Sequence, residues 1–309
     1  MKNSLLVLLI LFIPACLSNR PGENESVSDN GSIIVHGSRL GYKTEGEGIP
    51  CLVIGSSVYY PRTFSDSLKK HLKMYFVDLP WFSEEPAGIN LEDYNIEDIA
   101  DEIEEVRLEL NLEKPIIMGH SIHGTIAYEY SRQYPGNVRG IVMIGSPNTY
   151  GNDDYNKATD EFWATASDQR KEKQNRNWIL LAESDTVGKE GETVREYLAM
   201  APVYWYNPDY DASWLWEGMT VNEEIIDHIY GTIFHDYAMF QFMNNIPAPT
   251  LVVMGKYDYA VPYTLWQGYD TITGLTVKIL DKSGHTPQLE QSNEFDKALL
   301  NWINEAIDY

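Results

Sequence analysis

Short apolar runs alternate with helix-like segments through most of this 309-residue chain, and this rhythm limits the folds open to it more than any other feature. The β-like runs are GSIIVHG, PCLVIGS, MYFVDLP, PIIMGHS and VRGIVMIGSP. The helical patterns between and after them are RTFSDSLKKHL, IEDIADEIEEVRLELNL and IHGTIAYEYSRQY. Strand and helix in turn predict a fold of the α/β class, with a mostly parallel central sheet and helices on both of its faces.

The alternation is interrupted once. From about Asn148 to Asn245 the chain has helix-like, aromatic-rich segments, and strand patterns resume at APTLVVMGKYD and TVKILDKSGH before the closing helix NEFDKALLNWINEAI. An insertion between two late strands of one sheet explains this pattern more simply than two domains in series. We therefore expect a core of residues 32–147 and 246–309 and a mainly helical insertion of residues 148–245.

The first 31 residues are expected to lie outside the fold. An apolar run from Leu5 to Leu17 is shorter than the about 20 apolar residues of a membrane helix, so it fits a secretory signal better. Ile13-Pro14-Ala15-Cys16 resembles the lipobox of bacterial lipoproteins, although Pro14 departs from the small residues usual there and leaves ordinary signal cleavage open. We expect a signal peptide over residues 1–15, a lipid on Cys16 and a flexible tether over residues 16–31. The protein would then be exported and face the periplasm or the cell exterior, attached to the membrane only by this lipid.

The charge balance is strongly acidic, with 23 Lys and Arg against 46 Asp and Glu. Such a charge repels phosphate backbones, so nucleic acid is not an expected partner. The many acids of IEDIADEIEEVRLEL are expected on a solvated helix face, because they are spread around the helix and no His accompanies them. No metal and no cofactor is expected. Cys51 lies in an apolar run and is expected to be a small buried residue.

The segment Gly119-His120-Ser121-Ile122-His123-Gly124 stands between a strand pattern and a helix pattern and is almost a G-x-S-x-G nucleophile elbow. In that motif a strand turns sharply into a helix, and small neighbours let the backbone close around a strained Ser. A serine hydroxyl also needs a base and a third group that orients the base. His123 stands where the second glycine belongs. The turn accommodates it if the imidazole points away from the sheet and Gly124 supplies the close approach.

Apart from the insertion, residues 32–309 resemble the α/β-hydrolase superfamily. YNIEDIADEIEEVRLELNLEKPIIMGHSIHG is similar to its helix, strand and elbow, APTLVVMGKYDYAVP to the strand end that supplies the triad acid, and DKSGHTPQLEQSNEFDKALLNWI to the region of the triad base. The resemblance implies Ser121 as nucleophile, His285 as general base and then acid, and Asp258 as the group that fixes the tautomer of His285. The order Ser, Asp, His is that of this fold. Asp281, nearer to His285 in sequence, is expected at the surface.

The resemblance also implies an oxyanion hole made of two backbone N–H groups. The first donor is Ile122, the residue after the nucleophile. Gly55-Ser56 stand where the family usually has His-Gly, which points to Ser57 as the second donor, or to Ser56 if the register shifts by one residue. The run Asp78-Leu79-Pro80-Trp81-Phe82-Ser83 replaces a Gly-rich turn, so this loop is expected to be stiff and aromatic.

The insertion resembles the helical cap domains of this family, which roof the pocket. Its stretch APVYWYNPDYDASWLWEGM is dense in Tyr and Trp, which predicts an aromatic-lined site, or else a set of rings that only hold the cap to the core. The side chains expected to bind substrate are Tyr59, Trp81, Trp216 and Glu217. His120, adjacent to Ser121, either lines the pocket or is a packed or exposed histidine.

Three functional hypotheses follow. The first is an exported serine hydrolase that cleaves a small ester, lactone or amide, since a Ser nucleophile argues against the haloalkane dehalogenase and epoxide hydrolase branches. The second is an aminopeptidase for short peptides, because Trp214-Leu215-Trp216-Glu217-Gly218 is similar to the W-E-G element of proline iminopeptidases, in which acids receive a free amine. The third is a ligand-binding lipoprotein of the same fold in which His123 and Gly55 prevent turnover. The sequence carries no signal of the oligomeric state.

Overall fold

The computed structural model describes residues 29–183, 191–242, 246–269 and 271–307. Its centre is an eight-stranded sheet in which β1, β2 and β4 pair antiparallel and all other neighbours pair parallel. In spatial order the strands are β1 (Asn30–Val35), β2 (Ser38–Glu45), β4 (Leu72–Asp78), β3 (Ile49–Gly55), β5 (Ile116–His120), β6 (Gly140–Ile144), β9 (Thr250–Gly255) and β10 (Leu275–Leu280). The predicted mostly parallel sheet is confirmed.

The amino-terminal edge of the sheet differs from the prediction in two details. Strand β1 begins at Asn30, inside the predicted tether, and β2 was not predicted at all. The signal peptide, Cys16 and most of the tether lie outside the described residues. Among the described residues, no helix is both long and apolar enough to cross a bilayer.

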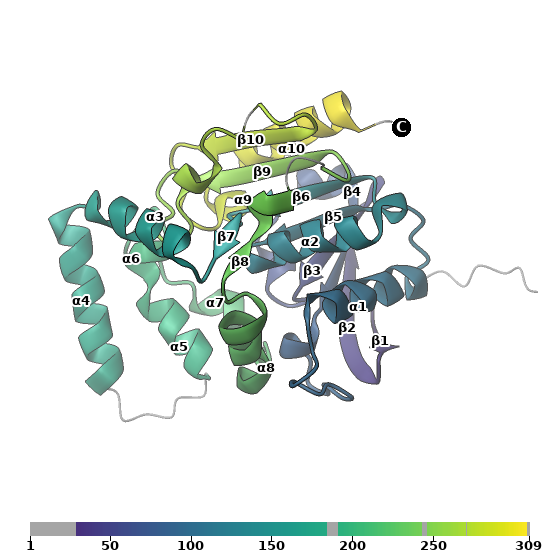
Figure 1. Cartoon of the computed structure of the whole chain (residues 1–309), viewed down its shortest axis with the longest axis horizontal. Coiled ribbons are helices and arrows are strands. Elements are labelled where there is room, and N and C mark those ends of the chain that lie inside the picture. The colour runs from purple at the N-terminus through teal and green to yellow at the C-terminus, as the bar shows by residue number, and fades with distance from the viewer. Residues whose placement is uncertain (1–28, 184–190, 243–245, 270, 308–309) are drawn as a thin grey trace, which may run out of the picture.

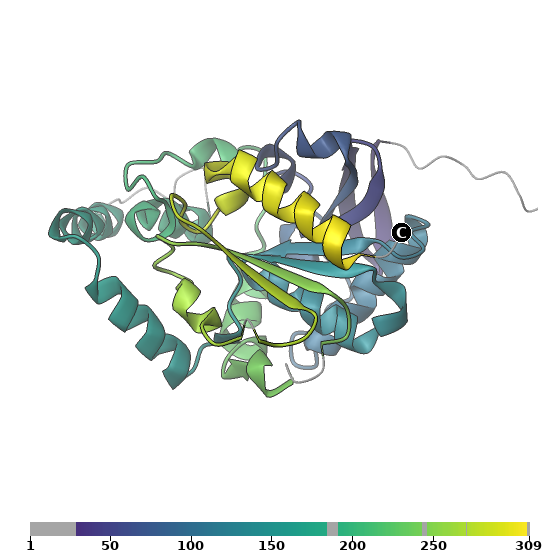
Figure 2. The same cartoon turned by 90° about the horizontal axis from the view of Figure 1, so that it is seen from above.

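Helices cover both faces of the sheet because alternate strand residues point to opposite sides. In β3, Leu52 and Ile54 belong to the core under α1 (Ile96–Glu109) and α2 (Ile122–Gln133), whereas Cys51 and Val53 belong to the core under α10 (Ser292–Ala306). Figure 1 shows α1 and α2 side by side on one face, and Figure 2 shows α10 crossing the other. Cys51 is buried with a free thiol, as expected.

The helix predicted over RTFSDSLKKHL is wrong. The only helical turn that lies within that segment is the 3₁₀ turn η2 (Leu68–Lys70), and another, η1 (Tyr60–Arg62), ends at its first residue. The Ser65 hydroxyl accepts a hydrogen bond from the Leu68 N–H at 3.0 Å, and such local side-chain bonds compete with helical ones. Short turns elsewhere in the core are η3 (Pro80–Phe82), η4 (Pro135–Asn137), η7 (Tyr263–Trp266) and α9 (Pro287–Glu290).

The chain between β6 and β9 lies beside the sheet and is mainly helical (Figure 1). A short antiparallel pair, β7 (Thr149–Tyr150) with β8 (Tyr237–Ala238), holds the two ends of this insertion together. The Arg62 guanidinium fastens it to the core by donating to the backbone carbonyls of Trp214, Leu215 and Glu217 at 2.8–2.9 Å. Its helices are α3 (Asp153–Ala164), α4 (Asp168–Glu183), α5 (Glu192–Ala199), α6 (Ala201–Tyr204), α7 (Ser213–Trp216), α8 (Glu223–His228), the π-helical turn η5 (Ile229–Ile233) and η6 (Met239–Phe242).

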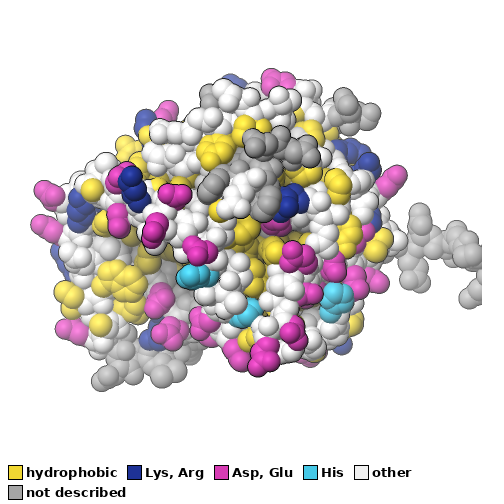
Figure 3. Space-filling model, in the orientation of Figure 1, with side chains coloured by type: hydrophobic (Ala, Val, Ile, Leu, Met, Phe, Trp, Pro, Cys, Tyr) yellow, Lys and Arg dark blue, Asp and Glu magenta, His cyan; other side chains and the backbone are white. Residues whose placement is uncertain are grey.

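Acidic side chains dominate the charged groups on the face shown in Figure 3, as the composition leads one to expect. One acid of α1 departs from the prediction of a solvated helix face. Glu102 is only 2% exposed, and an oxygen of its carboxyl group accepts a hydrogen bond from the Tyr94 hydroxyl at 2.8 Å. Burial, together with the nearby carboxylates of Asp98 and Glu105, raises the pKa of Glu102 to about 8 from an ordinary value of 4.5.

Glu102→Gln is expected to flatten the dependence of stability on pH. The folded protein holds the Glu102 proton more tightly than the unfolded chain does, so the resulting stabilisation is complete below pH 4.5 and is lost as the pH rises through about 8. The wild-type free energy of unfolding should therefore fall more steeply than that of the variant across this range. The extra loss over the whole range is at most about 1.4 kcal/mol for each unit by which the pKa of Glu102 differs between the folded and unfolded states. Urea unfolding at a series of pH values measures this difference. Parallel curves for the two proteins would contradict it.

Candidate active site

Ser121 occupies the sharp turn between β5 and α2. Its backbone has φ 56° and ψ −132°, a conformation that a residue with a side chain seldom adopts and that costs about 1–3 kcal/mol. Two backbone bonds hold the turn, from the Ser121 N–H to the Ile144 carbonyl at 2.7 Å and from the Gly124 N–H to the Ser121 carbonyl at 3.0 Å. This strained turn places Ser121 at the carboxyl edge of the parallel strands, where α/β sheets carry their sites.

Two glycines let the turn close. A Cβ on Gly119 would lie 2.2 Å from the backbone of His123, and a Cβ on Gly124 would lie 2.0 Å from the Ser146 hydroxyl. Gly124 therefore supplies the close approach, as expected. The His123 ring is buried among loop residues at the carboxyl end of β3, where a Cβ on Gly55 would come within 3.2 Å of it.

His285 and Asp258 form a buried pair beside Ser121. Asp258 follows β9 and His285 follows β10, and the carboxyl ends of these neighbouring parallel strands meet. His285 Nδ1 lies 2.7 Å from Asp258 Oδ2, while Asp258 Oδ1 accepts the N–H groups of Ala260 and Val261 at 3.0 and 2.8 Å. A carboxylate only accepts, so Nδ1 carries the proton and Nε2 is free to act as a base. Asp281 lies at the surface in an exposed ion pair with Lys256, as expected.

Further groups that the sequence did not indicate hold the His285 loop. The His285 N–H donates to the Tyr204 carbonyl at 2.6 Å, and the His285 carbonyl accepts from His120 Nε2 at 2.7 Å. Burial lowers the pKa of His120 well below its ordinary value, so this ring is a neutral donor. Glu290 accepts the N–H groups of Gly284 and Thr286 on either side of His285, at 2.9 and 3.3 Å, and burial raises its pKa to about 7.

The loop after β3 corrects the predicted second oxyanion donor. The Ser57 N–H donates to Asp78 Oδ1 at 2.6 Å, and the Ser57 hydroxyl donates to Asp78 Oδ2 at 3.0 Å. The Ser57 amide therefore faces Asp78 and not the site. Asp78 ends β4 directly opposite Gly55 of β3, a pairing across the sheet that no local pattern reveals. Ser56, the alternative one residue earlier, lines the cavity at Ser121, and within the described part of the chain its N–H has no hydrogen-bond acceptor.

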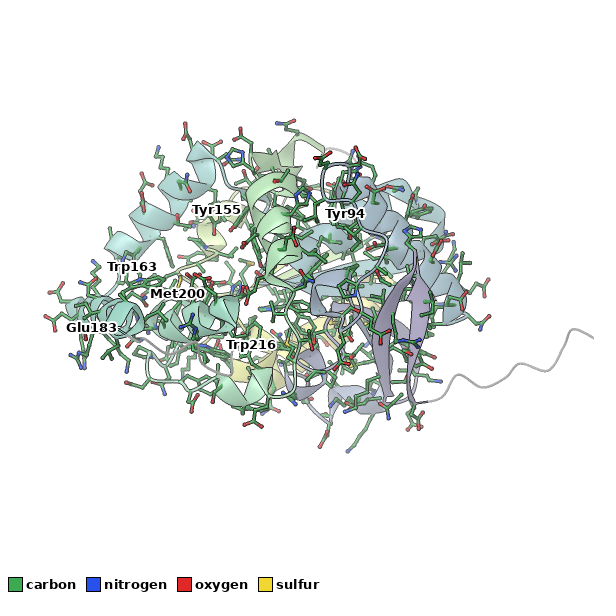
Figure 4. All side chains as sticks on the ribbon, turned by 90° about the horizontal axis from the view of Figure 1, so that it is seen from below. Tyr94, Tyr155, Trp163, Glu183, Met200 and Trp216 are labelled. Atoms are coloured by element: carbon green, nitrogen blue, oxygen red, sulfur yellow. The ribbon has the colours of Figure 1, made fainter. Side chains whose placement is uncertain are left out.

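A cavity of about 360 Å³ opens above Ser121, between the core and the insertion. The core contributes Ser56, Tyr60, Phe82 and His285, and the insertion contributes a set of mostly aromatic residues: Tyr150, Tyr197, Met200, Tyr204, Trp216 and Tyr230. In Figure 4, Met200 and Trp216 lie between the core and the outer edge of the insertion, which Glu183 marks. No group of metal-ligating side chains occurs in the ranges that the structure describes.

Only some of the predicted substrate contacts line this cavity. Tyr59 and Trp216 do, with ring centroids 5.1 Å apart. Trp81 does not, because its ring is 1% exposed and stacks on His123, and the neighbouring Phe82 reaches the cavity instead. Glu217 is exposed outside the cavity, and it meets the core through its backbone carbonyl.

His120, Glu196 and Asp227 also line the cavity, and the two acids were not predicted. The Ser121 hydroxyl and His285, both within the described part of the chain, line the same cavity but form no hydrogen bond with each other. Such contacts are often long without substrate and tighten when it binds. The arrangement therefore brings a hydroxyl, a base with an orienting carboxylate and Ser56 to one mostly aromatic cavity.

Comparison with known proteins agrees with this geometry. A family model described as alpha/beta hydrolase fold matches residues 48–292. The AB hydrolase superfamily protein YclE of Bacillus subtilis is 33% identical over 271 residues, which cover 87% of this chain and 96% of that protein. A proline iminopeptidase of Flavobacterium johnsoniae is 24% identical over 246 residues, covering 74% of this chain and 78% of the relative. The structure of an alpha/beta fold family hydrolase from Bacillus anthracis matches with a TM-score of 0.69 at 18% identity, covering 88% of this chain and 98% of that one.

Proposed function

The chain belongs to the α/β-hydrolase fold family and is a hydrolase, and from this premise we propose that it cleaves a small ester, lactone or amide through an acyl-enzyme on Ser121. The observation that carries the proposal is that Ser121, in its strained turn, lines the same cavity as His285, whose Nδ1 lies 2.7 Å from Asp258. These three residues follow the chain order of the Ser-Asp-His triad in this fold.

The proposed reaction has two halves. His285 Nε2 takes the Ser121 proton as the hydroxyl oxygen attacks the substrate carbonyl, and the N–H groups of Ile122 and Ser56 bind the oxygen that becomes negative. His285 then protonates the leaving group, and a water molecule activated by the same imidazole releases the acid. The cavity of about 360 Å³ and its aromatic lining favour a small substrate with an apolar acyl or leaving group.

An aminopeptidase is the second candidate, now on different residues. Glu217 lies outside the cavity and cannot receive a substrate amine there, but Glu196 and Asp227 line it and would favour a cationic group over an anionic one. Cleavage of a prolyl-anilide, lost when Glu196 and Asp227 are both changed to the corresponding amides, would favour this candidate over an esterase.

The third hypothesis, a ligand-binding protein of this fold without turnover, has less support. That hypothesis required His123 or Gly55 to distort the elbow or the oxyanion loop. His123 is instead packed beside Gly55 without opening the turn, and Gly124 makes the close approach. Since the chain is also a member of a hydrolase family, turnover is the better expectation.

A fluorophosphonate probe tests the proposal, because it reacts with activated serines. Wild-type protein should be labelled, Ser121→Ala should not, and His285→Ala should be labelled far more slowly, since the serine hydroxyl then lacks its base. Circular dichroism shows whether each protein is folded. Absence of labelling in a folded wild type would overturn the serine hydrolase proposal.

We also propose that the protein is exported and attached to a membrane by a lipid on Cys16. The support is the sequence of residues 1–31 alone, which resembles a lipoprotein signal followed by a polar tether. Metabolic labelling with radioactive palmitate tests it. Label that persists in Cys16→Ala would contradict attachment of the lipid at Cys16.

A further inference from the structure

His123, the residue that departs from the elbow motif, is the centre of a buried hydrogen-bond set. Its Nδ1 lies 2.8 Å from the Tyr60 hydroxyl oxygen and 3.1 Å from the His120 carbonyl oxygen. Its Nε2 lies 3.3 Å from the indole Nε1 of Trp81, whose ring stacks on the imidazole at an interplanar angle of 10°.

The partners of His123 determine where its proton lies. The Trp81 indole N–H can only donate, so His123 Nε2 must be the acceptor and carry no proton. Burial lowers the pKa of His123 to about 4, so the ring is neutral at ordinary pH and its one proton is on Nδ1. The His120 carbonyl, which can only accept, agrees with this assignment.

This tautomer fixes the role of the Tyr60 hydroxyl. Because Nδ1 carries a proton, the Tyr60 oxygen accepts from His123 and cannot donate to it. Within the described part of the chain, the Tyr60 O–H has no other acceptor, and Tyr60 lines the cavity together with Ser121 and Ser56. Its ring also lies directly against the loop that carries the Ser56 amide, since a Cβ on Gly55 would be 2.4 Å from Tyr60 Cε2.

We propose that the Tyr60 hydroxyl is a third hydrogen-bond donor to the oxyanion, beside the N–H groups of Ile122 and Ser56, and that His123 is the positioning residue that keeps it a donor. The proposal rests on the proposed function of Ser121. Attack by the Ser121 oxygen forms the new C–O bond and moves the carbonyl π electrons onto oxygen, where the Tyr60 O–H stabilises the charge without transferring its proton. Burial raises the pKa of Tyr60 well above its ordinary value, so the hydroxyl keeps that proton.

Tyr60→Phe removes only the hydroxyl and tests the proposal directly. With para-nitrophenyl acetate as substrate, kcat should fall by about 100-fold, the typical loss for one oxyanion donor, while KM changes by less than about twofold. Tyr128→Phe is the matched control. Tyr128 is buried in α2 outside the cavity, and none of the described residues forms a hydrogen bond with its hydroxyl, so the removal of that hydroxyl should leave kcat unchanged. A fall of less than about tenfold in a folded Tyr60→Phe protein would overturn the proposal.

Two further readouts separate this inference from the proposed function and from a merely structural role. Wild-type protein that the fluorophosphonate does not label would remove the serine mechanism, whereas normal wild-type labelling with an unaffected Tyr60→Phe would remove only the role of Tyr60. His123→Leu should lower kcat in the wild-type background but by less than about twofold in the Tyr60→Phe background, since residues that act as a unit are not additive. Equal falls in the two backgrounds would show that His123 does not act through Tyr60.

Discussion

Ser121→Ala is expected to lower kcat for ester hydrolysis by about 10⁵-fold or more, the largest effect of any single substitution in this chain. The variant has no oxygen to attack the carbonyl and so forms no acyl-enzyme. The proposed oxyanion donors, the N–H groups of Ile122 and Ser56, remain, and they would account for any rate above that of water. Initial rates with para-nitrophenyl acetate, measured at saturating substrate, give the ratio of the two proteins.

The matched control for this substitution is Ser131→Ala. Ser131 lies on α2, the same helix that Ser121 precedes, and its buried hydroxyl donates to the Tyr128 carbonyl at 2.6 Å. It does not line the cavity, so the rate should be that of the wild type. If Ser121→Ala keeps more than about a hundredth of the wild-type kcat, Ser121 is not the nucleophile.

Asp258→Asn is expected to lower kcat by about 10⁴-fold while leaving the fold intact. The N–H groups of Ala260 and Val261 already bind one oxygen of Asp258, so the amide oxygen of Asn takes that position. The amide nitrogen, a donor, then faces His285 Nδ1 and requires it to accept. The imidazole proton moves to Nε2, and the ring can no longer take the proton of Ser121.

Asp281→Asn is the control, because Asp281 is also an acid near His285 in sequence but lies at the surface in an exposed ion pair with Lys256. Exposed pairs of this kind contribute little to stability, so neither the rate nor the melting temperature should change appreciably. Equal activity of Asp258→Asn and wild type would show that the buried Asp258 carboxylate does not set the tautomer of His285. A loss of activity in Asp281→Asn would instead indicate that Asp281, and not Asp258, has that role.

Much of the site could be predicted because its parts are encoded locally. Ser121 sits in an elbow pattern between a strand and a helix, and Asp258 and His285 each follow an apolar strand run, with the order Ser, Asp, His. Parallel strands bring their carboxyl ends to one edge of the sheet, so three separate local patterns imply one site. The strands that the hydrophobic pattern predicts are thus also the elements that bring these residues together.

The errors fall where contacts between distant segments decide the outcome. Ser57 was preferred as an oxyanion donor because of its place after Gly55, but the carboxylate of Asp78, on the adjacent strand, takes its N–H. Trp81 was expected in the pocket because it is aromatic and in a loop, yet its ring is covered by stacking on His123. Neither contact has a signature in the sequence, because each depends on which side chain fills a particular space at the end of the sheet.

Local sequence patterns were enough to predict the α/β fold, the insertion and the three residues of the proposed triad, since hydrophobic period and turn residues act over a few neighbours. Packing between distant segments decided that the Ser57 amide is bonded to Asp78 and which aromatic rings line the cavity. The His123 tautomer shows why. It depends on Trp81, Tyr60 and the His120 carbonyl, which belong to three separate segments of the chain. The direction of each hydrogen bond is fixed only when these groups are packed around the one imidazole.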